Sequence, residues 1–84
     1  SNNVPLDKIA KYFARLAKNL VIEFVPKSDA KVKALLATRE DVFSRYTREG
    51  FEAAFGLYYK TLEAVPIRGS ERVLYLLERV VDPS

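Results

Sequence analysis

Leu20-Val21-Ile22-Glu23-Phe24-Val25 is the stretch that decides the fold, a nearly continuous apolar run that ends at Pro26. Four of its six residues are β-branched or aromatic, and this composition favours a β-strand. An apolar run without alternation is typical of a strand that is covered on both faces, as in sheets with helices on either side. We therefore predict a buried strand over residues 20–25 of an α/β domain.

A helix is predicted before this strand, over about residues 5–18. Pro5 suits its first turn, because proline has no amide hydrogen to leave unpaired. One apolar stripe follows helical spacing and comprises Leu6, Ile9, Ala10, Phe13, Leu16 and Ala17. We expect Phe13 and Leu16 to lie in the core. The basic side chains of this helix are interpreted as its solvated face: Lys8, Lys11, Arg15 and Lys18.

Helical patterns also follow the strand. Ser28 or Asp29 suits the N-cap of a helix that carries Val32, Leu35 and Leu36. A charged connection over 39–46 leads to Thr47, which is a second good N-cap. The helix after Thr47 is expected to place four residues on one apolar face: Phe51, Ala54, Phe55 and Tyr58.

Two further strands close the chain, at about 59–65 and 72–78. The turn between them reads Pro66-Ile67-Arg68-Gly69-Ser70, so the two strands are expected to pair antiparallel. We therefore predict one α/β domain over residues 1–84, with three strands and about three helices.

The composition limits the possible chemistry. The 84 residues contain no histidine, cysteine or tryptophan. Without imidazole or thiol groups, no Ser/His or Cys/His pair can form, and neither disulfides nor thiolate metal sites are possible. We therefore expect no catalytic and no metal-binding residues in this sequence. It has no apolar run near the roughly 18 residues of a membrane span and no signal peptide pattern, so we expect a cytoplasmic protein that binds no membrane.

Charge is unevenly distributed along the chain. Residues 1–39 have a net charge of +5, whereas residues 40–84 have a net charge of −2. A basic half could attract phosphate or an acidic surface. However, no basic patch interleaved with aromatic residues is present, so we expect no nucleic-acid partner.

Glu23 is the one charged residue of the first predicted strand, and it has two interpretations. It is either a buried, hydrogen-bonded acid at a site near the carboxyl end of the strand, or a peripheral residue that pairs with a Lys or Arg.

Four segments together resemble the C-terminal part of class I S-adenosylmethionine-dependent methyltransferases, some of which carry a nodulation-protein label. They are Leu-Val-Ile-Glu-Phe-Val-Pro-Lys-Ser-Asp (20–29), Arg-Glu-Asp-Val-Phe (39–43), Tyr-Thr-Arg-Glu-Gly-Phe-Glu (46–52) and Ser-Glu-Arg-Val-Leu-Tyr-Leu (70–76). The resemblance implies part of a Rossmann-like sheet of three mixed strands. The last strand would be antiparallel and inserted between the other two.

Members of that family bind their cofactor through a Gly-rich loop after the first strand of the sheet and an acidic residue at the end of the second. The glycines here, Gly50, Gly56 and Gly69, form no such loop. The resemblance therefore implies a methyltransferase fragment without the cofactor-binding half, inactive alone. The intact enzyme would use S-adenosylmethionine as its cofactor, whereas this chain alone would bind no cofactor. The missing N-terminal half of the enzyme would be a partner of this chain.

The resemblance also implies where a substrate would lie, because ligands of open α/β sheets bind at the carboxyl ends of the strands. Glu23, Lys27, Asp29, Arg39 and Asp41 are the candidates to face it. Alternatively, Arg39 and Asp41 brace the connection in which they lie.

Two other functions stay open beside the methyltransferase fragment: a stand-alone α/β interaction module that dimerises, and a small basic domain that touches anionic surfaces. Without its neighbour in the full sheet, the 20–25 strand would expose an unpaired apolar edge. We therefore expect a homo-oligomer joined through this strand or through the 5–18 helices.

Overall fold

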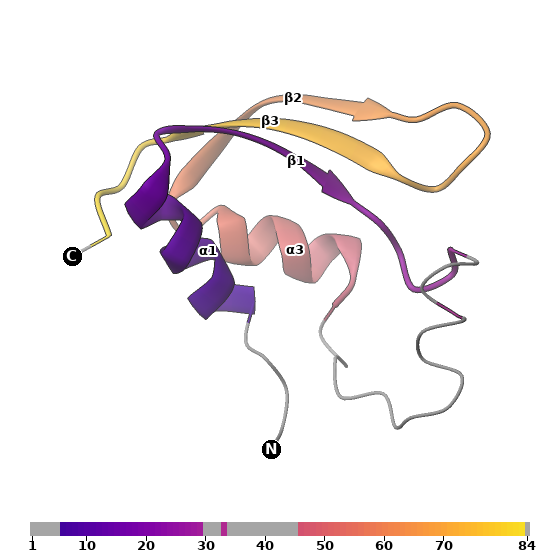
Figure 1. Ribbon diagram of the computed structural model, residues 1–84, viewed down its shortest axis with the longest axis horizontal. Helices are drawn as coiled ribbons and strands as arrows, with labels where there is room; N and C mark the ends of the chain where they lie inside the picture. Colours follow the sequence, from indigo (N-terminus) through magenta and orange to yellow (C-terminus); the bar gives the residue numbers. More distant parts are fainter. Residues whose placement is uncertain (1–5, 30–32, 34–45, 84) are drawn as a thin grey trace, which may run out of the picture.

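A computed structural model describes residues 6–29, 33 and 46–83 of the chain. The elements follow in the order α1 (Leu6–Leu16), β1 (Asn19–Phe24), α3 (Arg48–Phe55), β2 (Tyr59–Pro66) and β3 (Val73–Arg79). Both helices lie on the same side of the sheet, so the described part forms two layers (Figure 1). The predicted α/β class, the helix before the first strand and the helix after Thr47 are confirmed. The predicted helix with Val32, Leu35 and Leu36 lies outside the described residues.

The three strands are arranged in the order β1-β3-β2. β3 pairs antiparallel with both neighbours, which confirms the predicted pairing of the last two strands. Phe24, Val73 and Pro66 lie opposite one another, so the carboxyl ends of β1 and β2 meet at one end of the sheet. The described sheet is antiparallel rather than mixed as predicted, because β3 lies between β1 and β2 and pairs antiparallel with both, although β1 and β2 run in the same direction.

The hairpin between β2 and β3 turns where the sequence predicted it. The Ser70 amide donates to the Ile67 carbonyl at 3.2 Å, and the Ile67 amide donates to the Arg72 carbonyl at 3.0 Å. Gly69 has a φ of 79°, a left-handed conformation that glycine adopts without a steric cost.

The first helix packs through its smallest residues. Ala10 and Ala14 are completely buried, while Phe13 is partly buried and its ring centroid lies 6.3 Å from that of Phe55 in α3. Leu16 was expected in the core, but it is 64% exposed. The physical reason is that alanines on the contact side allow a close approach, which places the contact around Ala10 and Ala14 and leaves Leu16 on the solvent side.

Thr47 caps the second described helix as predicted. Its hydroxyl oxygen accepts a 3.0 Å hydrogen bond from the Gly50 amide, which satisfies one free donor of the first turn. Phe51, Ala54 and Phe55 of α3 are buried against the sheet, as the helical spacing indicated.

Aromatic rings form the centre of the core between the two layers. Phe51 lies with its ring centroid 5.5 Å from that of Phe24, 4.6 Å from that of Phe55 and 5.0 Å from that of Tyr75. Leu77 completes the buried side of β3. The core therefore joins α3 to β1 and β3.

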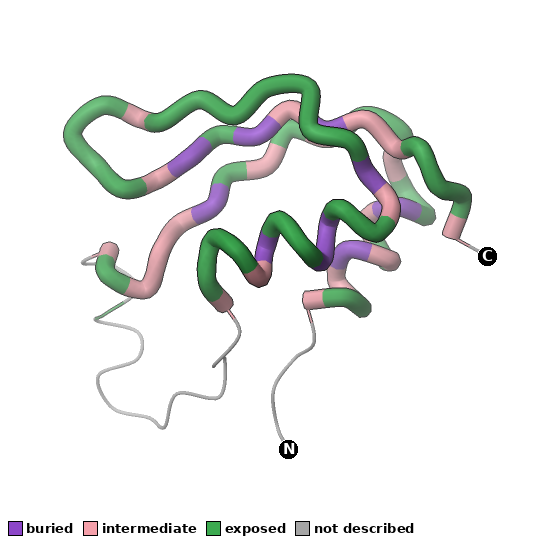
Figure 2. The backbone as a smooth tube through the Cα atoms, turned by 180° about the vertical axis from the view of Figure 1, so that it is seen from behind, coloured by how far each residue is buried: buried purple, intermediate pink, exposed green. Residues whose placement is uncertain are grey.

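β1 is covered on one face only. Its burial alternates, and Val21, on the face away from the helices, is 63% exposed. The predicted cover on both faces is wrong for the described chain, because α1 and α3 lie on one side of the sheet (Figure 1). β2 is exposed along its whole length after Tyr59 (Figure 2). One broad face of the sheet is thus open.

Candidate functional site

A hollow lies at the end of the sheet where β1 and β2 finish. It has a volume of about 540 Å³ and is lined by three segments: the end of β1 and the residues after it, the start of α3, and the hairpin between β2 and β3. Its polar lining side chains are Lys27, Tyr46, Thr47, Arg48, Ser70, Glu71 and Arg72. We call it the rim hollow. The register places it there, because Phe24, Val73 and Pro66 are neighbours across the strands.

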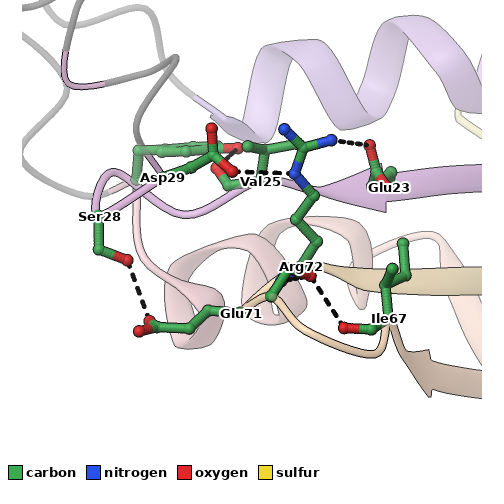
Figure 3. Close-up of polar contacts among 9 residues, drawn as sticks. Glu23, Val25, Ser28, Asp29, Ile67, Glu71 and Arg72 are labelled. Atoms are coloured by element: carbon green, nitrogen blue, oxygen red, sulfur yellow. Dashed lines mark hydrogen bonds and ion pairs between the residues drawn. The ribbon is translucent and has the colours of Figure 1, made fainter.

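Arg72 joins the two sides of the rim hollow. Its Nε donates to Oδ2 of Asp29 at 3.0 Å, and its Nη1 lies 3.7 Å from Oε1 of Glu23 (Figure 3). The hydrogen bond with Asp29 is the main cause that raises the pKa of Arg72 above its usual value. Arg72 therefore stays charged and links the hairpin to β1 and the loop after it.

Two further hydrogen bonds hold the segment that leaves β1. Ser28 Oγ donates to Oε1 of Glu71 at 3.0 Å, which ties this segment to the hairpin (Figure 3). Tyr46 donates its hydroxyl proton to the Val25 carbonyl at 2.6 Å, and its ring centroid lies 5.1 Å from that of Phe24. Burial raises the pKa of Tyr46, so its hydroxyl remains a donor at neutral pH. The rim hollow therefore has fixed walls on the β1 side.

A second polar cluster lies beside the hollow, at α3. Tyr75 is almost completely buried, yet its hydroxyl donates to Oε2 of Glu52 at 2.5 Å and accepts from Nε of Arg48 at 3.0 Å. Burial, and next the hydrogen bond with Glu52, raise the pKa of Tyr75. The cluster holds Arg48 in the lining of the hollow.

The structure brings some of the predicted site residues together. Glu23 and Asp29 meet at Arg72, and Lys27 lines the rim hollow. Arg39 and Asp41 lie outside the described residues. For Glu23 the peripheral interpretation holds, because its side chain is exposed and pairs with an arginine, and the interpretation as a buried acid is wrong.

Sequence reasoning missed Arg72, Tyr46 and Arg48 as parts of the site. A signal for Arg72 was present in the implied insertion of the last strand beside the 20–25 strand. Antiparallel pairing there brings the start of the last strand to the end of the first, so a charged residue at position 72 must lie near Glu23 and the loop after Val25.

The polar lining of the rim hollow consists of cationic and hydroxyl side chains and the carboxylate of Glu71. In the part of the chain that the structure describes, no three His, Cys, Asp or Glu side chains lie close enough together to hold a metal ion. All buried side-chain nitrogen and oxygen atoms there have hydrogen-bond partners. Neither described helix has the length and apolar composition needed to cross a bilayer.

Comparison with known proteins relates the chain to one segment of a larger protein. Over 79 residues it is 40% identical to the nodulation protein NoeA of Rhizobium meliloti (strain 1021). The match covers 94% of this chain but only 17% of the length of NoeA. No protein-family model and no solved structure matches the chain.

Proposed function

We propose that this chain is the C-terminal part of an S-adenosylmethionine-dependent methyltransferase, starting from its similarity to a segment of NoeA. The similarity to 17% of a longer protein supports a piece that works within a larger one. The sheet supports the methyltransferase class, because β3 lies antiparallel between two strands that run in the same direction. This is the arrangement that the sequence resemblance implies for the end of the methyltransferase sheet. The absence of cysteine fits a cytoplasmic location.

The rim hollow is the observation that carries this proposal. It lies at the carboxyl ends of β1 and β2, where open α/β sheets bind ligands. In the larger protein it would form a wall of the site for the methyl acceptor, and Arg72 would fix the position of that wall. Methyl transfer depends mainly on the alignment of nucleophile and sulfonium, so a rigid wall is a useful contribution. The contacts to S-adenosylmethionine would come from another part of the larger protein, and the chain alone would be inactive.

Photolabelling tests this division of roles. Full-length NoeA irradiated with radiolabelled S-adenosylmethionine should take up label that unlabelled cofactor competes away. Peptides from the 79-residue segment that matches this chain should stay unlabelled. No competed label in NoeA would contradict the methyltransferase class, and competed label on the matching segment would contradict the division of roles.

A stand-alone interaction module that dimerises is the second candidate function. The observation that favours it is the position of β1, which pairs only with β3 within the described sheet and therefore has one open edge. Two copies could pair their 20–25 strands antiparallel around a two-fold axis, or pack their 5–18 helices together. Light scattering should then give the mass of a closed dimer. The chain should also bind no S-adenosylmethionine, either alone or as part of a longer protein.

A further inference from the structure

The sheet has an open apolar centre on the face away from the helices. The register places Val21 opposite Leu76 and Leu74 opposite Val65 on this face, because Val73, Tyr75 and Leu77 point into the core. Val21, Leu74 and Val65 are exposed large apolar residues, with Val65 at 48%. We use the name outer sheet face for the set Val21, Val65, Leu74 and Leu76. Figure 1 shows both helices on the opposite side of the sheet.

Acidic side chains surround the outer sheet face. Glu63 lies opposite Leu76 and shares its face, and Glu78 lies opposite Asn19 and Lys60. Glu23, opposite Leu74, is also on this face, where Arg72 pairs with it. Three carboxylates thus flank the apolar centre, whereas the described cations beside it are two, Lys60 and the Arg72 that pairs with Glu23, so acidic groups are in excess.

The exposed side of α1 has the complementary character. Lys8, Tyr12, Arg15 and Leu16 follow helical spacing on the side away from the buried Ala10 and Ala14. Tyr12 is 61% exposed, and Leu16 is exposed to a similar extent. This ridge, which we call the α1 ridge, offers two apolar side chains flanked by two cations.

We propose that the α1 ridge of one copy of this chain docks onto the outer sheet face of a second copy. Charge complementarity favours a second copy as the partner of the outer sheet face. The apolar side chains of the ridge are flanked by Lys8 and Arg15, and those of the sheet face by Glu63 and Glu78, so opposite charges would meet around an apolar contact. Pairing two outer sheet faces would instead bring acidic groups together. The inference goes beyond the proposed function and does not depend on the methyltransferase class.

The geometry makes this contact head-to-tail. α1 lies on the side of the sheet away from the outer sheet face (Figure 1), so the α1 ridge of one copy cannot cover the outer sheet face of the same copy. A docked pair of copies leaves one ridge and one sheet face free. Such a heterologous contact either closes into a ring or grows as an open chain.

A mixing experiment tests the proposal. Tyr12→Asp would disable the ridge and leave the sheet face intact, and Val65→Lys would do the reverse. Both positions are exposed, so both variants should keep the native circular dichroism spectrum. Tyr12→Ser and Val65→Thr are milder replacements if either fails to fold. Glu49→Lys is the matched control, since Glu49 is an exposed residue of α3 outside both surfaces.

Sedimentation velocity gives the readout. The unchanged chain and Glu49→Lys should form species larger than a dimer as the concentration rises, and added salt should weaken them. Tyr12→Asp and Val65→Lys should each associate about tenfold or more weakly alone. Their equimolar mixture should form a one-to-one complex, because one intact ridge meets one intact sheet face. A monomeric unchanged chain, a closed dimer that resists both changes, or a mixture that stays monomeric would each overturn the proposal.

Discussion

Arg72 and Asp29, 43 positions apart in the sequence, are joined by a 3.0 Å hydrogen bond from Nε to Oδ2. The Glu23 carboxylate is a weaker second partner, at 3.7 Å and with more exposure to solvent than Asp29. Asp29 should therefore dominate the link between the hairpin and the loop after β1.

Double-mutant cycles in urea unfolding should reveal this order. The coupling free energy between Arg72→Ala and Asp29→Asn should exceed the coupling between Arg72→Ala and Glu23→Gln, because the hydrogen bond is shorter and less exposed. Arg68→Ala, at an exposed position in the same hairpin turn, is the control. Equal coupling free energies with Asp29 and Glu23 would contradict the dominance of Asp29 and show that Arg72 interacts with both acids to the same extent.

Leu77 and Leu16 form a matched pair of leucines for testing the core. Leu77 is almost completely buried, so Leu77→Ala should lower the free energy of unfolding by about 2–5 kcal/mol. Leu16→Ala should change it by no more than roughly 0.5 kcal/mol, since Leu16 faces solvent. Urea denaturation measures both. A large loss at Leu16 would contradict the placement of α1.

Tyr75 should make the fold sensitive to alkaline pH. Its pKa in the folded chain is raised above the usual 10.0, and burial raises the pKa values of Tyr46 and Tyr59 in the same direction. Above pH 10 the unfolded chain loses these protons first, so the folded chain holds more protons and its stability falls as pH rises. Below pH 10 the contribution is fully present.

Chemical denaturation between pH 8 and 11 checks this expectation, with both limits chosen to bracket the usual tyrosine pKa of about 10. Tyr75→Phe should flatten the alkaline loss of stability, because one of the shifted groups is removed. A slope that Tyr75→Phe does not alter would show that the Tyr75 hydroxyl is ionised with equal ease in both states.

Local sequence signals were sufficient for most of the elements. The capping hydroxyl of Thr47 predicted the start of its helix, and Gly69 predicted the hairpin turn. Both predictions were possible because helix capping and turn conformation depend on only a few neighbouring residues. The exposure of Leu16 and Val21 could not be predicted in the same way. Periodicity locates an apolar stripe, but which residues are covered depends on where the other layer lies.

The site was harder to predict than the fold. Glu23 and Asp29, which meet at Arg72, were already candidates because they lie on or beside the strand that the sequence marks most strongly. Arg72 was missed because its role depends on strand register, which brings residues 43 positions apart into contact.

Calorimetric titration with S-adenosylmethionine tests the central claim most directly. The 84-residue chain should give no saturable heat up to about millimolar cofactor, whereas full-length NoeA, which contains the matching segment, should give a one-to-one isotherm. A one-to-one isotherm tighter than about 100 µM for the chain alone would contradict the placement of the cofactor contacts outside it. Absence of binding by full-length NoeA would contradict the methyltransferase class itself.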